Sequence, residues 1–170
     1  TLPTSGTASV GGADILREPE RVKAIIGVSP QETAVAPNLT VRENLAFMCG
    51  VYGYASAAAQ ARVDRLVSDF DLSSVLSRRA GKLSGGWQRR LSIALALIGD
   101  PEVLFLDEPT LGLDVIARSE LWDVIRALKG RTTVILTTHY MEEAEALSDR
   151  VGIMKAGKLL TVGTPAEICA

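Results

Sequence analysis

An apolar run that ends in two acids lies near the middle of the chain: Val103-Leu104-Phe105-Leu106-Asp107-Glu108-Pro109. Such a run predicts a fully buried strand of a parallel sheet, because helices cover both faces of these sheets. Ligands bind at the carboxyl edge of α/β sheets, where successive side chains point to opposite sides of the strand. One of the two carboxylates can therefore hold Mg²⁺ while the other faces a water, as phosphoryl transfer requires. The alternative is a strand that ends in two solvated acids.

Strands and helices alternate on both sides of this run. Residues 87–98 and the stretch capped by Asp114 have helical spacing, whereas Ile25–Ser29 and Thr132–Thr137 are typical of buried strands. This order predicts a parallel sheet with right-handed crossovers. The first thirty residues otherwise indicate only short strands and turns, and two short strands flank Ala156-Gly157 near the end. We expect a small antiparallel part beside the main sheet.

Residues 40–80 have a different, helical pattern. A capping box at Thr40-Val41-Arg42-Glu43 opens one helix, which we expect Gly50 and Gly53 to close. A second helix places four apolar residues on one face: Val63, Leu66, Val67 and Phe70. The two helices predict a small helical subdomain inserted into an α/β body.

The composition fits one globular domain, with 170 residues of which 47% are hydrophobic and 22% charged. A formal net charge of −2 gives no electrostatic reason to hold nucleic acid, so no nucleic-acid partner is expected. The longest apolar stretches fall far short of the roughly 20 residues that span a bilayer. Cys49 and Cys169 form neither a disulfide framework nor a metal-binding spacing.

Two further motifs suit phosphate binding. Ser84 is a good N-cap, and the Gly85-Gly86 pair after it lets a phosphate approach the free N–H groups of a helix start. His139 follows the strand 132–137 and so also lies at a carboxyl edge. The alternatives are an ordinary Ser-Gly-Gly turn that opens a core helix and a structural histidine.

The order of these motifs resembles that of the ATP-binding-cassette (ABC) ATPases. In that family's terms, Gln31 corresponds to the Q-loop, Leu83–Gly86 to the signature motif, Val103–Glu108 to Walker B, Leu111–Asp114 to the D-loop and His139 to the switch histidine. The resemblance implies an α/β, P-loop NTPase-like fold: a mostly parallel sheet flanked by helices, with an inserted helical subdomain and a small antiparallel part. It implies a single partial domain with four parts. Residues 1–31 form a β-rich part with the Q-loop, and residues 32–83 form the helical signature subdomain. Residues 84–163 form the core with the signature helix, Walker B, the D-loop and the switch histidine, and residues 164–170 begin a truncated helix.

The resemblance also implies catalytic roles, with ATP and Mg²⁺ bound. Asp107 and Gln31 would contact Mg²⁺. Glu108 would orient or deprotonate the attacking water, and His139 would contact the γ-phosphate. Gln31 would in addition sense the partner domain.

Other roles implied by the resemblance lie between two copies of the domain. Ser84, Gly85, Gly86 and Gln88 would reach ATP held by the opposite subunit. Asp114 would couple the two sites of a head-to-tail dimer, which we expect to be a homodimer. An integral-membrane permease subunit is the second implied partner, which places the domain at the cytoplasmic face of the cell membrane.

The sequence departs from the family pattern in two ways. Trp87 stands where the signature motif usually has Gln, and the alternative to a nucleotide role is that it packs against the helical subdomain. No complete G-x-x-x-x-G-K-[ST] phosphate loop is present. The nearest match, 152–158, lies within an expected hairpin and is followed by Leu159 in place of Ser or Thr. We expect the true loop upstream of Thr1, and hence weak MgATP binding by these residues alone.

Several stretches are similar to multidrug and antibiotic-resistance exporters: residues 37–45 after the Q-loop, 88–91 after the signature and 138–145 around the switch. The implied function is an ATP-hydrolysing subunit that powers export of a drug-like substrate or ion. A degenerate, non-hydrolysing regulatory cassette and a non-transport ABC ATPase are the alternatives. The retained Glu108 argues against a degenerate cassette.

Overall fold

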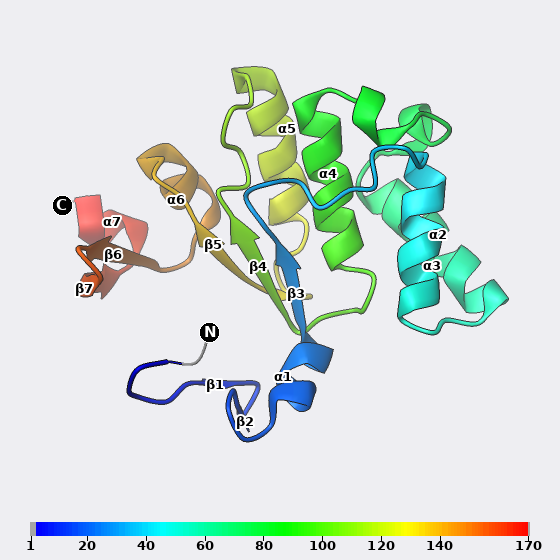
Figure 1. The fold of residues 1–170 in the computed structure, drawn as a ribbon. Helices are drawn as coiled ribbons and strands as arrows, with labels where there is room; N and C mark the ends of the chain where they lie inside the picture. Colours follow the sequence, from blue (N-terminus) through cyan, green and yellow to red (C-terminus); the bar gives the residue numbers. More distant parts are fainter. Residues whose placement is uncertain (1–2, 170) are drawn as a thin grey trace.

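A three-stranded parallel sheet forms the centre of the computed structural model, which describes residues 3–169 (Figure 1). Its strands are β3 (Ile26–Ser29), β4 (Val103–Asp107) and β5 (Thr133–Thr137), in the order β3-β4-β5. Phe105 lies between Val28 and Ile135 in the register. The predicted parallel sheet is confirmed, and all three strands end at the same edge.

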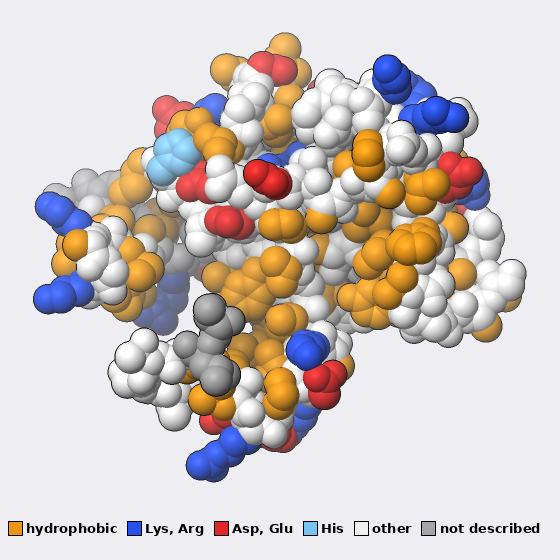
Figure 2. Space-filling view, in the orientation of Figure 1, with side chains coloured by type: hydrophobic (Ala, Val, Ile, Leu, Met, Phe, Trp, Pro, Cys, Tyr) orange, Lys and Arg blue, Asp and Glu red, His pale blue; other side chains and the backbone are white. Residues whose placement is uncertain are grey.

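Helices cover only one face of this sheet within the described residues. Helices α4 (Gly85–Ala96) and α5 (Val115–Arg126) lie behind the strands in Figure 1, where Leu104 and Leu106 are buried. On the other face Val28 and Ile135 are 53% and 48% exposed, and Figure 2 shows an apolar patch over the strands. The prediction of a fully buried β4 is therefore wrong: its side chains alternate because one face has no covering layer in this part of the chain.

Two longer helices, α2 (Val41–Val51) and α3 (Ser56–Asp69), pack together at one end of the sheet. The predicted capping box is confirmed, since the Glu43 N–H donates to Thr40 Oγ1 (3.2 Å) and the Thr40 N–H donates to Glu43 Oε2 (2.7 Å). The predicted apolar face of the second helix is buried as well. Two 3₁₀ turns, Ser73–Val75 and Ala80–Lys82, lead from α3 to α4.

Of the two glycines expected to close helix α2, only the second does so. Gly50 lies inside the helix, and Gly53, with φ +72°, ends it. The Gly53 N–H donates to the Gly50 carbonyl and the Tyr54 N–H to the Cys49 carbonyl, both at 3.0 Å. This bond pattern is a Schellman motif, which needs the left-handed conformation that glycine adopts without strain.

The ends of the described chain form smaller units on either side of the sheet. The first contains β1 (Ser9–Val10), β2 (Ala13–Asp14) and a short helix, α1 (Pro19–Ile25). Sequence reasoning missed α1, because it has a single buried residue, Val22, and hence no apolar stripe. Pro19 at its first position was the available signal.

The last unit is the predicted hairpin followed by a helix. Strands β6 (Val151–Lys155) and β7 (Lys158–Gly163) are antiparallel, and α6 (Met141–Leu147) precedes them while α7 (Pro165–Cys169) follows. Lys158 begins a strand, so residues 152–158 do not have the loop-to-helix geometry of a phosphate loop. None of the helices described between residues 3 and 169 is long and apolar enough to cross a bilayer.

Gly27 allows β3 to lie close against α4. A Cβ at this position would overlap the carbonyl oxygen of Ala96, a backbone atom that cannot swing away. We expect Gly27→Ala to lower the free energy of unfolding by about 1–3 kcal/mol, measured by denaturant titration. Gly50→Ala is the control, because a Cβ there meets open space and replaces a glycine inside a helix. If Gly27→Ala and Gly50→Ala had the same free energy of unfolding, the close approach of β3 to α4 at Gly27 would be contradicted.

Candidate functional site

The carboxyl edge of the sheet gathers the predicted catalytic side chains. Asp107 ends β4, Glu108 follows it, His139 lies two residues after β5, and Gln31 lies two residues after β3. The shared edge follows from the parallel register, in which Ser29, Leu106 and Leu136 pair across the three strands. We call Gln31, Asp107, Glu108, Thr137 and His139 the catalytic edge.

Glu108 and His139 contact each other directly. His139 Nδ1 lies 2.8 Å from Glu108 Oε2, and because a carboxylate only accepts hydrogen bonds, Nδ1 carries the proton. The backbone of Glu108 has φ +47°, a strained conformation for a residue with a side chain. Strain of this kind concentrates at functional sites, where surrounding contacts hold it. Here the Glu108 N–H donates to the Thr137 carbonyl (3.1 Å).

Thr137 supports both acids of the catalytic edge, and sequence reasoning did not identify it. Its hydroxyl donates to Asp107 Oδ1 (2.5 Å) and accepts from the Glu108 N–H (3.3 Å). The contact arises because Thr137 pairs with Asp107 in the register of β4 and β5. Only the register reveals this pairing, and the sequence shows Thr137 merely as one of several β-branched residues.

Removal of the Thr137 hydroxyl should therefore weaken catalysis. We expect Thr137→Val to lower the ATP turnover of the full-length subunit about ten-fold, the effect of one lost hydrogen bond to a charged group. Steady-state phosphate release measures this change. Thr133→Val is the control, because Thr133 is also exposed on β5 but pairs with Val103 at the opposite end of β4. An equal loss in both variants would mean that the strand itself, and not the hydroxyl, is responsible.

The oxygen atoms at the catalytic edge suit Mg²⁺. Asp107 is exposed and offers a carboxylate oriented by Thr137, and Gln31 is exposed and carries an amide oxygen. Among residues 3–169 no group of three or more His, Cys, Asp or Glu side chains could hold a metal ion by itself. Mg²⁺ does not require one, since it usually takes one or two carboxylates together with waters and substrate phosphates. The donor set therefore fits Mg²⁺ bound with a nucleotide.

The signature residues lie at the start of α4. Ser84 is the N-cap residue of α4, as predicted, with an extended backbone, but its side chain makes no capping hydrogen bond. The exposed hydroxyl thus remains available to a ligand. A Cβ on Gly86 would lie 3.3 Å from the Ala117 side chain, which shows how closely the starts of α4 and α5 approach.

Asp114 lies with the signature residues. Its Oδ1 accepts from the Ala117 N–H (2.9 Å), which confirms its predicted role as the cap of α5. Asp114, Ser84 and Gly86 line a cavity of about 290 Å³. We call Ser84, Gly85, Gly86 and Asp114 the signature face. The predicted site residues thus form two groups, one at the catalytic edge and one at this face.

Gln88 and Trp87 are partly buried beside the signature face. The Gln88 amide donates to the Leu83 carbonyl (3.1 Å) and accepts from Thr33 Oγ1 (3.4 Å), so it joins α4 to the segment after the Q-loop position. Trp87 packs against the core, and the Arg90 guanidinium lies 4.8 Å from its ring centre. These contacts are those expected of a packing role for Trp87.

Comparison with known proteins gives the same family as the motifs. Residues 1–111 match the family model described as ABC transporter. The chain is 43% identical over 169 residues to the daunorubicin resistance ATP-binding protein DrrA3 of Streptomyces coeruleorubidus, covering 99% of this chain and 54% of that protein. It is 42% identical over 167 residues to the daunorubicin/doxorubicin resistance ATP-binding protein DrrA of Streptomyces peucetius, covering 98% and 51%.

A plant relative shows the same likeness within a much longer protein. ABC transporter A family member 10 of Arabidopsis thaliana is 46% identical over 169 residues, which cover 98% of this chain but 18% of that protein. The chain therefore spans about half the length of the Streptomyces relatives and less than a fifth of the plant one. Because the family model covers well over half of the residues, and five motifs of the family occur in its order, the chain belongs to the ABC transporter family.

Proposed function

We propose that this chain is part of an ATP-hydrolysing subunit that powers export of a drug-like substrate or ion through a separate membrane permease. One observation carries the hydrolytic part of the proposal: Glu108 is held at the carboxyl edge of the sheet and contacts His139, beside the Mg²⁺-type carboxylate of Asp107. A non-hydrolysing regulatory cassette is the second possibility, but it gives no reason for this arrangement.

Each residue of the catalytic edge has a distinct task in the proposed reaction. Asp107 and Gln31 would hold Mg²⁺, which would supply positive charge to neutralise the substrate phosphates. Glu108 accepts a proton from the attacking water or orients it. His139 donates its Nδ1 proton to Glu108, and its Nε2 donates to the γ-phosphate in the imidazolium form, in which both ring nitrogens carry a proton. The positive φ of Glu108 and the hydrogen bonds of Thr137 fix the positions of Asp107 and Glu108, so that each acid keeps its own task.

A second cassette completes the proposed site. The signature face opens to solvent at the start of α4, where free N–H groups and the helix dipole favour a phosphate. Val115 and Ile116, directly after Asp114, are exposed although both are large and apolar. We therefore place a second copy of the cassette head-to-tail against this face, with Ser84, Gly85, Gly86 and Gln88 directed to its ATP and Asp114 coupling the two sites.

The export assignment rests on the relatives. Two Streptomyces proteins with over 40% identity are named for daunorubicin resistance and described as ATP-binding proteins. We propose that this cassette likewise binds ATP in the service of drug resistance, at the cytoplasmic face of the cell membrane and with the permease as a separate chain.

The test is phosphate release by the full-length subunit, measured with and without Mg²⁺ and with the permease in vesicles that contain a fluorescent anthracycline. We expect Mg²⁺-dependent hydrolysis and ATP-dependent movement of the anthracycline. Hydrolysis without movement would support the ATPase and refute the export of anthracyclines. ATP binding and dimerisation without hydrolysis would favour the regulatory cassette instead.

A further inference from the structure

Helix α4 carries the signature residues in its first turn and a buried arginine one turn later. The Arg89 Nη1 atom donates to the Pro30 carbonyl (2.7 Å), and its Nη2 atom donates to the Gln31 carbonyl (2.5 Å). One guanidinium thus holds two successive carbonyls at the Q-loop position. A planar fork of donors suits such a contact, whereas a lysine ammonium provides a single point of attachment.

Two further contacts align the same segment with α4. Ser29 and Ser92 share a buried hydrogen bond between their hydroxyls (3.0 Å). At the other end, Thr33 donates to Gln88 (3.4 Å). Because these bonds lie on either side of the Arg89 contact, residues 29–33 run along one side of α4 and cannot shift independently of the helix.

The environment of Arg89 is costly for a cation. The residue is 5% exposed and its hydrogen-bond acceptors are uncharged carbonyls. Burial lowers the pKa of Arg89, while the negative charge of Asp107 acts in the opposite direction. A buried charge of this kind is weak evidence for stability, so a role in geometry is the better explanation of its position.

We propose that Arg89 is a positioning residue that couples the signature face to Gln31. The inference rests on the proposed function, in which Ser84, Gly85 and Gly86 meet the partner's ATP. Movement of the start of α4 toward that ATP moves Arg89 with it. Arg89 in turn moves the Gln31 backbone at the catalytic edge, so binding at one site adjusts the Mg²⁺ contact at the other.

The test compares Arg89→Gln and Arg89→Lys in the full-length subunit. We expect Arg89→Gln to lower kcat about ten-fold or more with less than about a three-fold change in KM for MgATP, and to lower the cooperativity of hydrolysis. Arg89→Lys should recover part of kcat, since it keeps the charge and one of the two bonds. The exchange of the backbone amide hydrogens in residues 31–35 should become faster in Arg89→Gln even without nucleotide.

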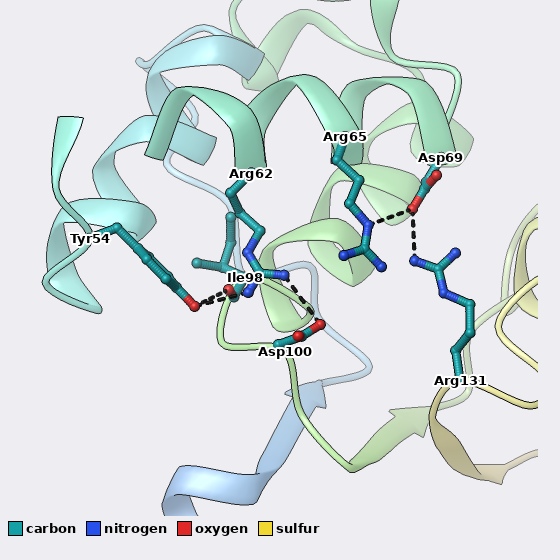
Figure 3. A network of polar contacts seen from close by, with 7 residues as sticks. All are labelled: Tyr54, Arg62, Arg65, Asp69, Ile98, Asp100 and Arg131. Atoms are coloured by element: carbon teal, nitrogen blue, oxygen red, sulfur yellow. Dashed lines mark hydrogen bonds and ion pairs between the residues drawn. The ribbon is translucent and has the colours of Figure 1, made fainter. Parts of the chain in front are cut away.

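Arg62→Gln is the matched control for the loss of a largely buried arginine. Arg62 on α3 pairs with Asp100 (3.2 Å) and donates to Tyr54 (3.0 Å), in the network drawn in Figure 3, which includes no residue of the catalytic edge. We expect Arg62→Gln to lower the melting temperature of the subunit without changing kcat of the folded protein. Equal effects of Arg62→Gln and Arg89→Gln on kcat, or unchanged amide exchange in residues 31–35, would overturn the role of Arg89. Absence of hydrolysis by the wild-type subunit would refute the proposed function, and the amide exchange would still test Arg89.

Discussion

Glu108→Gln is expected to lower the ATP turnover of the full-length subunit by about 10²–10⁴-fold, the usual contribution of a general base. The amide keeps the shape of the side chain but cannot accept a proton from water. MgATP binding should persist, because Asp107, Thr137 and the signature face are unchanged. Phosphate release and equilibrium binding of a fluorescent ATP analogue measure the two quantities separately.

The contact with His139 adds a second expectation for the same variant. The introduced glutamine side chain would still accept through its amide oxygen, so the His139 ring should keep its position, and the loss of turnover should come from proton transfer alone. Glu145→Gln is the control, because Glu145 is an exposed acid on α6. Unchanged turnover in Glu108→Gln would show that another group activates the water. Loss of binding together with turnover would instead make Glu108 a nucleotide-binding residue.

The catalytic edge was largely predictable because its residues follow strands directly. The apolar run that ends at Asp107-Glu108 and the β-branched run before His139 identify two strand ends, and a parallel sheet must bring them together. The resemblance to ABC ATPases then supplied the roles. Thr137 and Arg89 could not be found in this way. Their functions depend on the register between β4 and β5 and on the packing of α4 against residues 30 and 31.

Errors in the predicted fold have the same physical origin. The apolar run of β4 has no period of its own, so the sequence did not show that Leu104 faces helices while Phe105 lies on the open face. Gly50 and Gly53 are both typical helix terminators. Only the positive φ of Gly53 and the bonds around it distinguish the residue that ends α2 from the one inside it.

Phe70→Ala should produce the largest loss of stability, about 3–5 kcal/mol in the free energy of unfolding, as for other fully buried aromatic residues. Phe70 is 1% exposed and closes the apolar face of α3, which joins the core shared by the helical part and α4. Phe47→Ala makes the same chemical change on α2 at a side chain that is 62% exposed. We expect that control to change stability by about 0.5 kcal/mol or less.

The pair of phenylalanine variants separates burial from residue type. Denaturant titration of both variants, with ATP turnover measured below the unfolding transition, gives stability and function independently. Because Phe70 lies outside both the catalytic edge and the signature face, the folded fraction of Phe70→Ala should retain turnover within about three-fold, unlike Glu108→Gln. A small loss of stability in Phe70→Ala would mean that α3 does not share the core of the sheet.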